Sequence, residues 1–411
     1  LYVIPRYKTA FINPFSDVPT MELLCSFYNS DGEPLESDPS YIIRKAHAAF
    51  TKETGARFHA LAELEYYVIS ESEPLYPCIN QRGYHESRPF SQSENLRVEA
   101  LRLIAQAGGK IKYGHSEVGC FTMGKTLYEQ HEIEFLPQPI EDAVDQLIIA
   151  KWIVRMLGEK AGVTISYAPK ITIGKAGSGL HFHMMAVRDG VNLMVDESGL
   201  SDLAKKMIAG LLECSTPLTA FGNTIPTSYL RLVPHQEAPT NVCWGDRNRS
   251  VVVRVPLGWT GGNRMIQTAN PAFPPDVPVR MSKQTIEFRI PDGSADVYNL
   301  GAGLVVACLH GIRMPGALDK ARDLYVDGNL FDERNREKLK SLKQLPGSCV
   351  ESAQALLEKR AIFESDGIFP ASVIDSTARR LEEFKDRGMS ERIYGKEDEI
   401  RAIVNEFIHI K

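Results

Sequence analysis

An apolar segment, residues 57–70, carries two glutamates two positions apart, and this feature most constrains what the chain can fold into. In a β-strand, alternate side chains lie on one face, so Glu63 and Glu65 would present both carboxylates to the same side. Flanking residues such as Leu61 and Val68 indicate that the strand is largely buried. Two adjacent buried anions repel each other unless a cation or a proton neutralises them. The pair predicts a cation site. Because two glutamates at this spacing are common in proteins, solvated charges at the edge of a sheet are the alternative.

More acidic residues and a histidine stand in strand-like or turn-like segments elsewhere. They are Glu117, Glu132, His181 and Glu287. Taken singly, each is more typical of a structural charge or a hydrogen-bonded core residue. Taken with Glu63 and Glu65, they supply the oxygen ligands that hard divalent cations prefer, and the set looks like a two-metal site for phosphoryl transfer. Glu134 lies two positions after Glu132, so one of these two carboxylates is a candidate structural partner.

A glycine-rich turn leads into a strand that bears two histidines. Gly177 and Gly179 permit a tight turn and close approach of a ligand, and His181 and His183 then share one face of the strand. A ligand role and a hydrogen-bonded core role both remain open for these histidines.

Arginines gather in the same half of the chain, and their planar forks suit phosphate oxygens. Arg249 and Arg254 are five positions apart, so a regular strand would place them on opposite faces, and a bulge or bend is needed for them to converge. Glu287 and Arg289 share a face, which predicts either an ion pair or a metal ligand beside a phosphate or carboxylate clamp.

The bulk composition excludes several classes of function. A formal net charge of −5 without a basic tract argues against a nucleic-acid partner. The longest apolar run, around residues 300–312, is too short to span a membrane, and no secretory signal is visible. Seven widely spaced cysteines indicate a reducing compartment, so we expect a cytoplasmic protein. Because the chain begins at Leu1, we also expect that an N-terminal piece is missing.

Helical and strand-like patterns are mixed along the chain without strict alternation, which favours an antiparallel-rich α/β or α+β fold. The expected helices are residues 39–55, 94–107, 141–162, 201–219 and 299–313, with a mostly helical segment at 317–411. The expected strands are residues 57–70, 110–118, 131–137, 164–173, 180–188 and 285–291.

Five motifs in order resemble those of the glutamine synthetase family. They are Glu63-Leu64-Glu65-Tyr66, Gly177 to His183, Tyr229 to Pro234 with Glu237-Ala238-Pro239, Arg247 to Ser250 with Arg254-Val255-Pro256, and Ile286 to Arg289. The resemblance implies an α+β catalytic domain over residues 38–411, with a curved, mostly antiparallel sheet flanked by helices. Residues 1–37 would be a remnant of the N-terminal domain and linker, with the family's β-grasp domain largely absent.

The resemblance also implies roles for individual residues. Glu65, Glu117 and Glu132 would hold one divalent cation, Mg²⁺ or Mn²⁺, and Glu63, His181 and Glu287 the second. Arg231 and Arg289 would hold glutamate beside Gly177. Arg249 and Arg254 would contact ATP phosphates, His183 would assist ATP binding, and Glu237 would lie on a loop that closes over the intermediate. The chain departs from the family pattern at Ala176, at His235-Gln236 and at Thr285.

The activity implied is ATP-dependent ligation of ammonia to L-glutamate through γ-glutamyl phosphate. The expected partners are glutamate, ammonium and ATP, with a ring-shaped homo-oligomer, a dodecamer favoured. One alternative is a γ-glutamyl-polyamine or amine ligase of the same family, which would tend to lack the glutamate found here at Glu237. The other is a non-catalytic member, which should have lost metal ligands.

Overall fold

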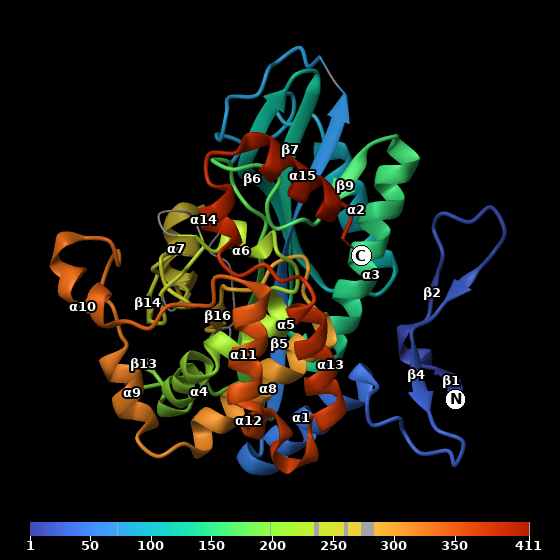
Figure 1. Cartoon of the computed structure of the whole chain (residues 1–411). Helices are drawn as coiled ribbons and strands as arrows, with labels where there is room; N and C mark the ends of the chain where they lie inside the picture. Colours follow the sequence, from blue (N-terminus) through green and yellow to red (C-terminus); the bar gives the residue numbers. More distant parts are fainter. Residues whose placement is uncertain (72, 198, 234–237, 259–261, 273–282, 411) are drawn as a thin grey trace.

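The computed structural model describes residues 1–71, 73–197, 199–233, 238–258, 262–272 and 283–410. Its centre is a ten-stranded sheet, mostly antiparallel and flanked by helices (Figure 1). The main path through this sheet runs β14 (Trp244–Asp246), β15 (Val253–Val255), β16 (Ile286–Phe288), β10 (Leu180–Arg188), β5 (Arg57–Glu71), β7 (Thr126–Phe135) and β6 (Ile111–Met123). Among the pairs within this sheet, only β14–β15 is parallel. The α+β class is therefore confirmed.

Strand β5 is the longest element of the sheet, with 15 residues. It pairs with the long strands β7 and β10 and with two short strands, β8 (Gln138–Pro139) and β9 (Thr164–Ser166). Its alternate residues Leu64 and Tyr66 are fully buried. Helices α1, α2 and α3 contact β5, β6 and β7. The other face of β5, which carries Glu63 and Glu65, borders a cavity.

The long helices begin and end at signals that the sequence carries. Helix α1 (Pro39–Thr54) begins where an Asp38 carboxylate oxygen accepts a hydrogen bond from the Ser40 amide, and it ends at Gly55 with a φ of 67°. Helix α3 (Ile140–Ala161) ends at Gly162 in the same left-handed conformation. Helix α8 (Val297–Arg313) is almost wholly buried and packs against α1, α3, α4 and α5.

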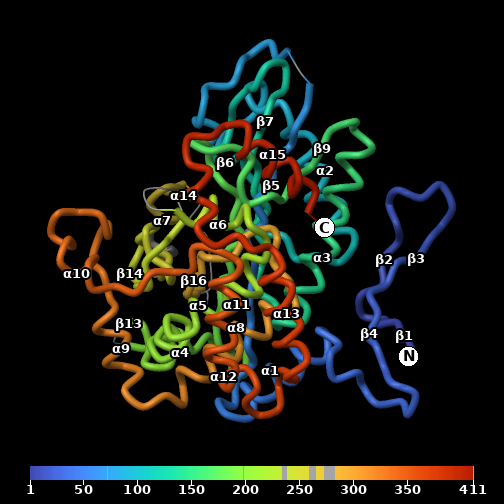
Figure 2. Tube along the Cα trace, in the orientation of Figure 1, coloured from blue at the N-terminus to red at the C-terminus, as the bar shows by residue number. Residues whose placement is uncertain are grey.

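The remaining helices lie mostly in the second half of the chain (Figure 2). They are α2 (Glu94–Gln106), α4 (Asp202–Glu213), α5 (Ser215–Gly222), α6 (Ser228–Arg231), α7 (Gly262–Ala269), α9 (Ala317–Asp323), α10 (Arg336–Ser341), α11 (Cys349–Glu358), α12 (Arg360–Glu364), α13 (Ala371–Glu382), α14 (Met389–Ile393) and α15 (Glu397–Phe407). Among the described residues no single helix has the length and apolar character to cross a membrane; α8 and α9 meet those criteria only as a pair, bent by 108°.

Residues near the N-terminus form an arm that stands beside α3 (Figures 1 and 2). Strand β1 (Tyr2–Pro5) pairs with β4 (Cys25–Tyr28), and β2 (Phe11–Ile12) pairs with β3 (Met21–Glu22). The arm is attached to α3 by an ion pair of 2.7 Å between Arg6 and Asp145 and by the rings of Phe11 and Phe15 against Trp152.

Two expected strands were too long, and residues 285–291 form a strand only at Ile286–Phe288. Residues 164–173 form a strand only at Thr164–Ser166, after which the chain continues as a loop to Leu180. Pro169 lacks an amide hydrogen for a sheet ladder, and Gly174 has a φ of 76°, so neither residue continues the strand. The expected strands 110–118 and 131–137 are instead longer toward each other, as Ile111–Met123 and Thr126–Phe135, and form the β6–β7 hairpin, which turns at Gly124 with a φ of 62°.

Candidate active site

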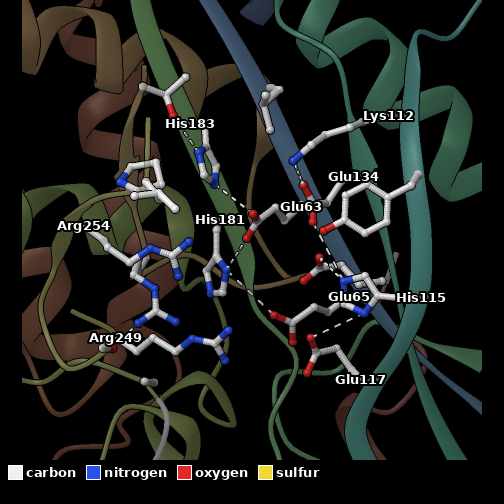
Figure 3. A pocket seen from close by; sticks show the side chains of 18 of the residues that line it. Glu63, Glu65, Lys112, His115, Glu117, Glu134, His181, His183, Arg249 and Arg254 are labelled. Carbon is white, nitrogen blue, oxygen red and sulfur yellow. Dashed lines mark hydrogen bonds and ion pairs between the residues drawn. The ribbon is translucent and has the colours of Figure 1, made fainter. Parts of the chain in front are cut away.

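A cavity of about 1170 Å³ opens on the face of the sheet that carries the predicted ligands (Figure 3). Its lining includes most of the residues singled out from the sequence: Glu63, Glu65, Glu117, Glu132, Gly177, His181, His183, Arg231, Arg249, Arg254 and Arg289. Glu287 is completely buried at its edge. Glu237 lies outside the described residues.

Strand register explains why these side chains meet. Glu63 on β5 is the direct partner of His181 on β10 and of Glu134 on β7, while Glu65 faces Glu132. Directly paired residues in a sheet point to the same face, so each pairing adds another polar side chain to the same wall. The alternation predicted for β5 is therefore confirmed, and its neighbours repeat it.

One cluster of candidate ligand atoms lies where β5, β10 and β16 meet. Atoms of Glu63, His183 and Glu287 all lie within 4.8 Å of one another. His181 joins this group, because its Nδ1 atom is 2.9 Å from Glu63 Oε2 and 3.8 Å from Glu287 Oε1. The three residues that the family resemblance assigns to the second cation are thus brought together, with His183 as an additional close nitrogen.

A second cluster lies where β6 and β7 meet β5. Atoms of His115, Glu117 and Glu132 lie within 4.8 Å of one another. Glu63, Glu132 and Glu134 form another such group, so the two clusters are continuous. Glu65 borders them, with its Oε1 atom 3.9 Å from His181 Nδ1 (Figure 3).

The electrostatics of the clusters fit divalent cations. Burial raises the pKa of Glu132 well above its ordinary value, and the nearby charges of Glu63, Glu65 and Glu117 raise it further. Burial by itself would lower the pKa of His115, but hydrogen bonds to Glu132 and Glu134 raise it to about 11. The repulsion that disfavours ionisation of Glu132 indicates an excess of negative charge at the clusters. Oxygen-rich donors with that excess suit hard cations such as Mg²⁺.

Arginines occupy the opposite side of the cavity, where Figure 3 shows Arg249 and Arg254. Arg254 Nε lies 2.6 Å from Glu287 Oε2, and Arg289 Nε donates to Glu287 Oε1 over 2.9 Å. Arg249 is in the turn before β15 rather than in the strand, and Arg247 in that turn has a φ of 52°. This bend lets Arg249 and Arg254 line one cavity, which a regular strand would not allow.

The glycine turn and Arg231 form a further part of the wall. A Cβ atom at Gly177 would lie 2.6 Å from the Pro169 carbonyl oxygen and 3.1 Å from Arg231 Cγ, so a larger residue does not fit there. Arg231 donates to the carbonyl of Ile290 over 2.8 Å, and its Nη2 atom is 3.5 Å from His181 Nε2.

Several lining residues escaped the sequence reasoning. His115 precedes Glu117 by two positions, so strand alternation is the signal that would have found it. Lys112 pairs with Glu134, so Glu134 has a structural partner other than a cation. Tyr84 belongs to the long segment between β5 and α2; its ring lies 5.8 Å from the Arg249 guanidinium, and no periodic pattern marks it.

Several known proteins are similar to this chain in sequence. A family model described as "Glutamine synthetase, catalytic domain" matches residues 36–383. The chain belongs to the glutamine synthetase family. A glutamine synthetase of Thermococcus kodakarensis is 31% identical over 360 residues, which are 87% of this chain and 73% of that relative. One from Nostoc sp. is 29% identical over 408 residues, 90% of this chain and 79% of its own.

The fold agrees with that family. A cryoEM structure of Plasmodium falciparum glutamine synthetase superimposes with a TM-score of 0.74, covering 96% of this chain and 84% of that one. Its sequence identity is 19%, so this likeness concerns the fold alone.

Proposed function

We propose that this glutamine synthetase family member ligates ammonia to L-glutamate at the expense of ATP, with residues 38–411 as its catalytic domain. The observation that carries the proposal is the convergence of two clusters of candidate metal ligands and of Arg249 and Arg254 on one cavity. Hard cations and arginine forks are the two devices that bind a polyphosphate. A cavity of about 1170 Å³ is large enough to hold a nucleotide together with an amino acid.

The chemistry needs ATP because a carboxylate is a poor acceptor for ammonia, since the leaving group would be oxide. An oxygen of the γ-carboxylate attacks the γ-phosphorus and ADP leaves, which gives γ-glutamyl phosphate. Ammonia then attacks the carbonyl carbon and phosphate leaves. One Mg²⁺ or Mn²⁺ ion would bind at Glu65, Glu117 and Glu132, and a second at Glu63, His181 and Glu287. When bound, the two ions would neutralise charge on the phosphate oxygens.

The chain's own residues bind and orient the reactants. Arg249 and Arg254 hold the transferred phosphoryl group, and His183 assists ATP binding. Arg231 and Arg289 hold glutamate next to Gly177, where the absence of a side chain lets the turn pack closely against Pro169 and Arg231. Glu237, on the loop proposed to close over the intermediate, takes a proton from ammonium. Closure of this loop excludes water.

The proposal extends to assembly and location. The active form is a ring-shaped homo-oligomer, a dodecamer favoured, in the cytoplasm. Its partners are small molecules rather than nucleic acid or membrane, in keeping with a net charge of −5. The mass in solution, measured by light scattering, checks the ring; a monomer would contradict it.

A phosphate-release assay tests the reaction. With ATP, Mg²⁺ and glutamate, we expect release with ammonium and little with putrescine or ethanolamine. The variant Glu237→Gln should lower kcat with ammonium, because it lacks the base. Release with an amine alone would favour the amine ligase, and no release with any acceptor would favour a non-catalytic protein.

A further inference from the structure

The amide of Gln130 joins three segments of the chain behind the ligand clusters. Gln130 is on β7, and its side chain is 2% exposed. Its Nε2 atom lies 3.0 Å from Glu65 Oε2 and 3.0 Å from the Gly177 carbonyl oxygen. Its Oε1 atom accepts a hydrogen bond of 3.0 Å from the amide of Gly119 on β6. A single side chain thus connects a candidate metal ligand, the glycine turn and the strand that carries Glu117.

The orientation of this amide follows from its partners. Three groups lie near Nε2: the Glu65 carboxylate and the Gly177 carbonyl are acceptors only, and the Ser178 hydroxyl, at 3.2 Å, can also accept. The group near Oε1, the Gly119 amide, is a donor only. A flipped amide would place oxygen against oxygen and hydrogen against hydrogen. A buried polar group that loses its hydrogen-bond partner destabilises the fold, so Gln130 stays in one orientation.

The surrounding backbone is shaped to admit this amide. The ladder between β6 and β7 is interrupted between Ser116 and Cys120, and Glu117 lies within this irregular stretch. A Cβ atom at Gly119 would overlap the Tyr67 hydroxyl and lie 2.6 Å from Gln130 Oε1, so only glycine lets the strand approach both side chains so closely. The Gly119 amide also anchors the irregular stretch to β7 through Gln130.

The Glu65 carboxylate is held from two sides by these contacts. Its Oε2 atom accepts a 2.8 Å hydrogen bond from the Gly179 amide in addition to that from Gln130. Both donors approach the same oxygen, which fixes the direction of the carboxylate. Partners of this kind orient a metal ligand and raise the affinity of a site, and their loss typically costs about 10–100-fold in metal affinity.

We infer that Gln130 is a positioning residue that fixes Glu65, the Glu117 stretch and the glycine turn at one spacing. The inference rests on the proposed function, because it concerns the cation assigned to Glu65, Glu117 and Glu132. Gln130 acts through these residues rather than by touching a substrate. Its removal should therefore weaken one cation and leave the other, at Glu63, His181 and Glu287, bound as before.

Mn²⁺ titration followed by electron paramagnetic resonance tests this without turnover. For the full chain we expect two bound equivalents, and in Gln130→Met one of them should weaken by about 10–100-fold. The KM for glutamate should rise more than kcat falls, since the glycine turn loses its tie through Gly177. If Gln130→Met does not fold, Gln130→Asn is used, because it keeps an amide but withdraws it by one methylene group.

Gln146→Met is the matched control. Gln146 is also buried, and its Oε1 atom accepts a 2.9 Å hydrogen bond from the Lys110 amide just before β6, away from the ligands. It should lose stability while keeping both Mn²⁺ equivalents. Unchanged Mn²⁺ affinity in a folded Gln130 variant, or an equal loss in Gln146→Met, would overturn the inference. Two Mn²⁺ equivalents without ligase turnover in the unaltered protein would instead overturn the proposed function.

Discussion

Arg254 and Glu287 are direct partners across β15 and β16, and Arg254 Nε lies 2.6 Å from Glu287 Oε2. Glu287 is completely buried, so the guanidinium balances its charge in the protein without ligands. A polyphosphate in the cavity would compete with this carboxylate for the same guanidinium. Cation binding at Glu287 and phosphate binding at Arg254 should therefore favour each other, because the cation replaces the arginine as the partner of the carboxylate.

Replacing Arg254 with methionine should lower kcat by about 10²–10³-fold, the usual loss when a charge that stabilises a transition state is removed. Phosphate release at saturating ATP measures this. Arg313→Met is the control, since Arg313 pairs with Glu53 and Asp366 outside the cavity and should leave turnover unchanged. Equal turnover in the two variants would rule out a phosphate role for Arg254.

Replacing Glu65 with glutamine should change stability in opposite directions with and without cations. Glu65 is one of the charges that, after burial, raise the pKa of Glu132, so its neutralisation should stabilise the metal-free protein. The stabilisation by Mg²⁺ should shrink, and turnover should fall by at least about 100-fold. Thermal unfolding in EDTA and in Mg²⁺ measures both effects. Glu71→Gln, at the exposed end of β5, should change neither the stabilisation by Mg²⁺ nor turnover. A Glu65 variant that behaves like the Glu71 variant would contradict the assignment of Glu65 as a metal ligand.

Acid should remove the contribution of Glu213 to folding. Burial opposes its ionisation, but hydrogen bonds from Lys320 and Lys359 lower its pKa from 4.5 to about 2. A lowered carboxylate pKa stabilises the fold above the unfolded value and loses that effect as pH falls toward the folded one. Because the side chain is 25% exposed, we expect Glu213→Gln to cost about 1–2 kcal/mol at pH 7.

Urea unfolding of the Glu213 variant at pH 7 and near pH 3 measures this difference, which should shrink at the lower pH. Glu337→Gln serves for comparison, because Glu337 is 85% exposed and should show no effect at either pH. A constant difference between the two pH values would contradict the ion-pair explanation.

Trp152→Ala should release the N-terminal arm from α3. Phe11 and Phe15 each pack on this ring, at centroid distances of 5.8 and 5.5 Å, and such pairs contribute about 0.5–1.5 kcal/mol each. Trypsin should then cleave more rapidly within residues 1–37. Tyr7→Ala, whose side chain is 81% exposed, should not change the cleavage rate. An unchanged rate in the Trp152 variant would show that Arg6 and Asp145 suffice.

Local signals predicted the elements that position the site. The acidic pair on an alternating apolar strand predicted β5 and its inward face, and Asp38 with Gly55 marked both ends of α1. These features depend on neighbours in sequence, which is why residue patterns reveal them. The family resemblance then supplied the grouping of distant residues, which no local pattern contains.

Other features depend on contacts between distant segments. Glu117 lies in the irregular stretch of the β6–β7 ladder, where the Gly119 amide donates to Gln130 Oε1 across the two strands. The convergence of Arg249 with Arg254 depends on a left-handed residue, Arg247, which sequence patterns do not mark. Strand alternation would have indicated His115, whereas the place of Tyr84 and the convergence of the two arginines depend on tertiary packing.

Strand β5 contributes to both ligand clusters and pairs on both sides with strands distant in sequence. The first cluster, of Glu63, His183 and Glu287, extends from residue 63 to residue 287, so no short fragment of the chain contains it. Cation binding at this cluster should therefore appear only at the last stage of folding, after the long-range pairings have formed. Binding of Mn²⁺ would therefore report whether a purified molecule has formed the complete sheet.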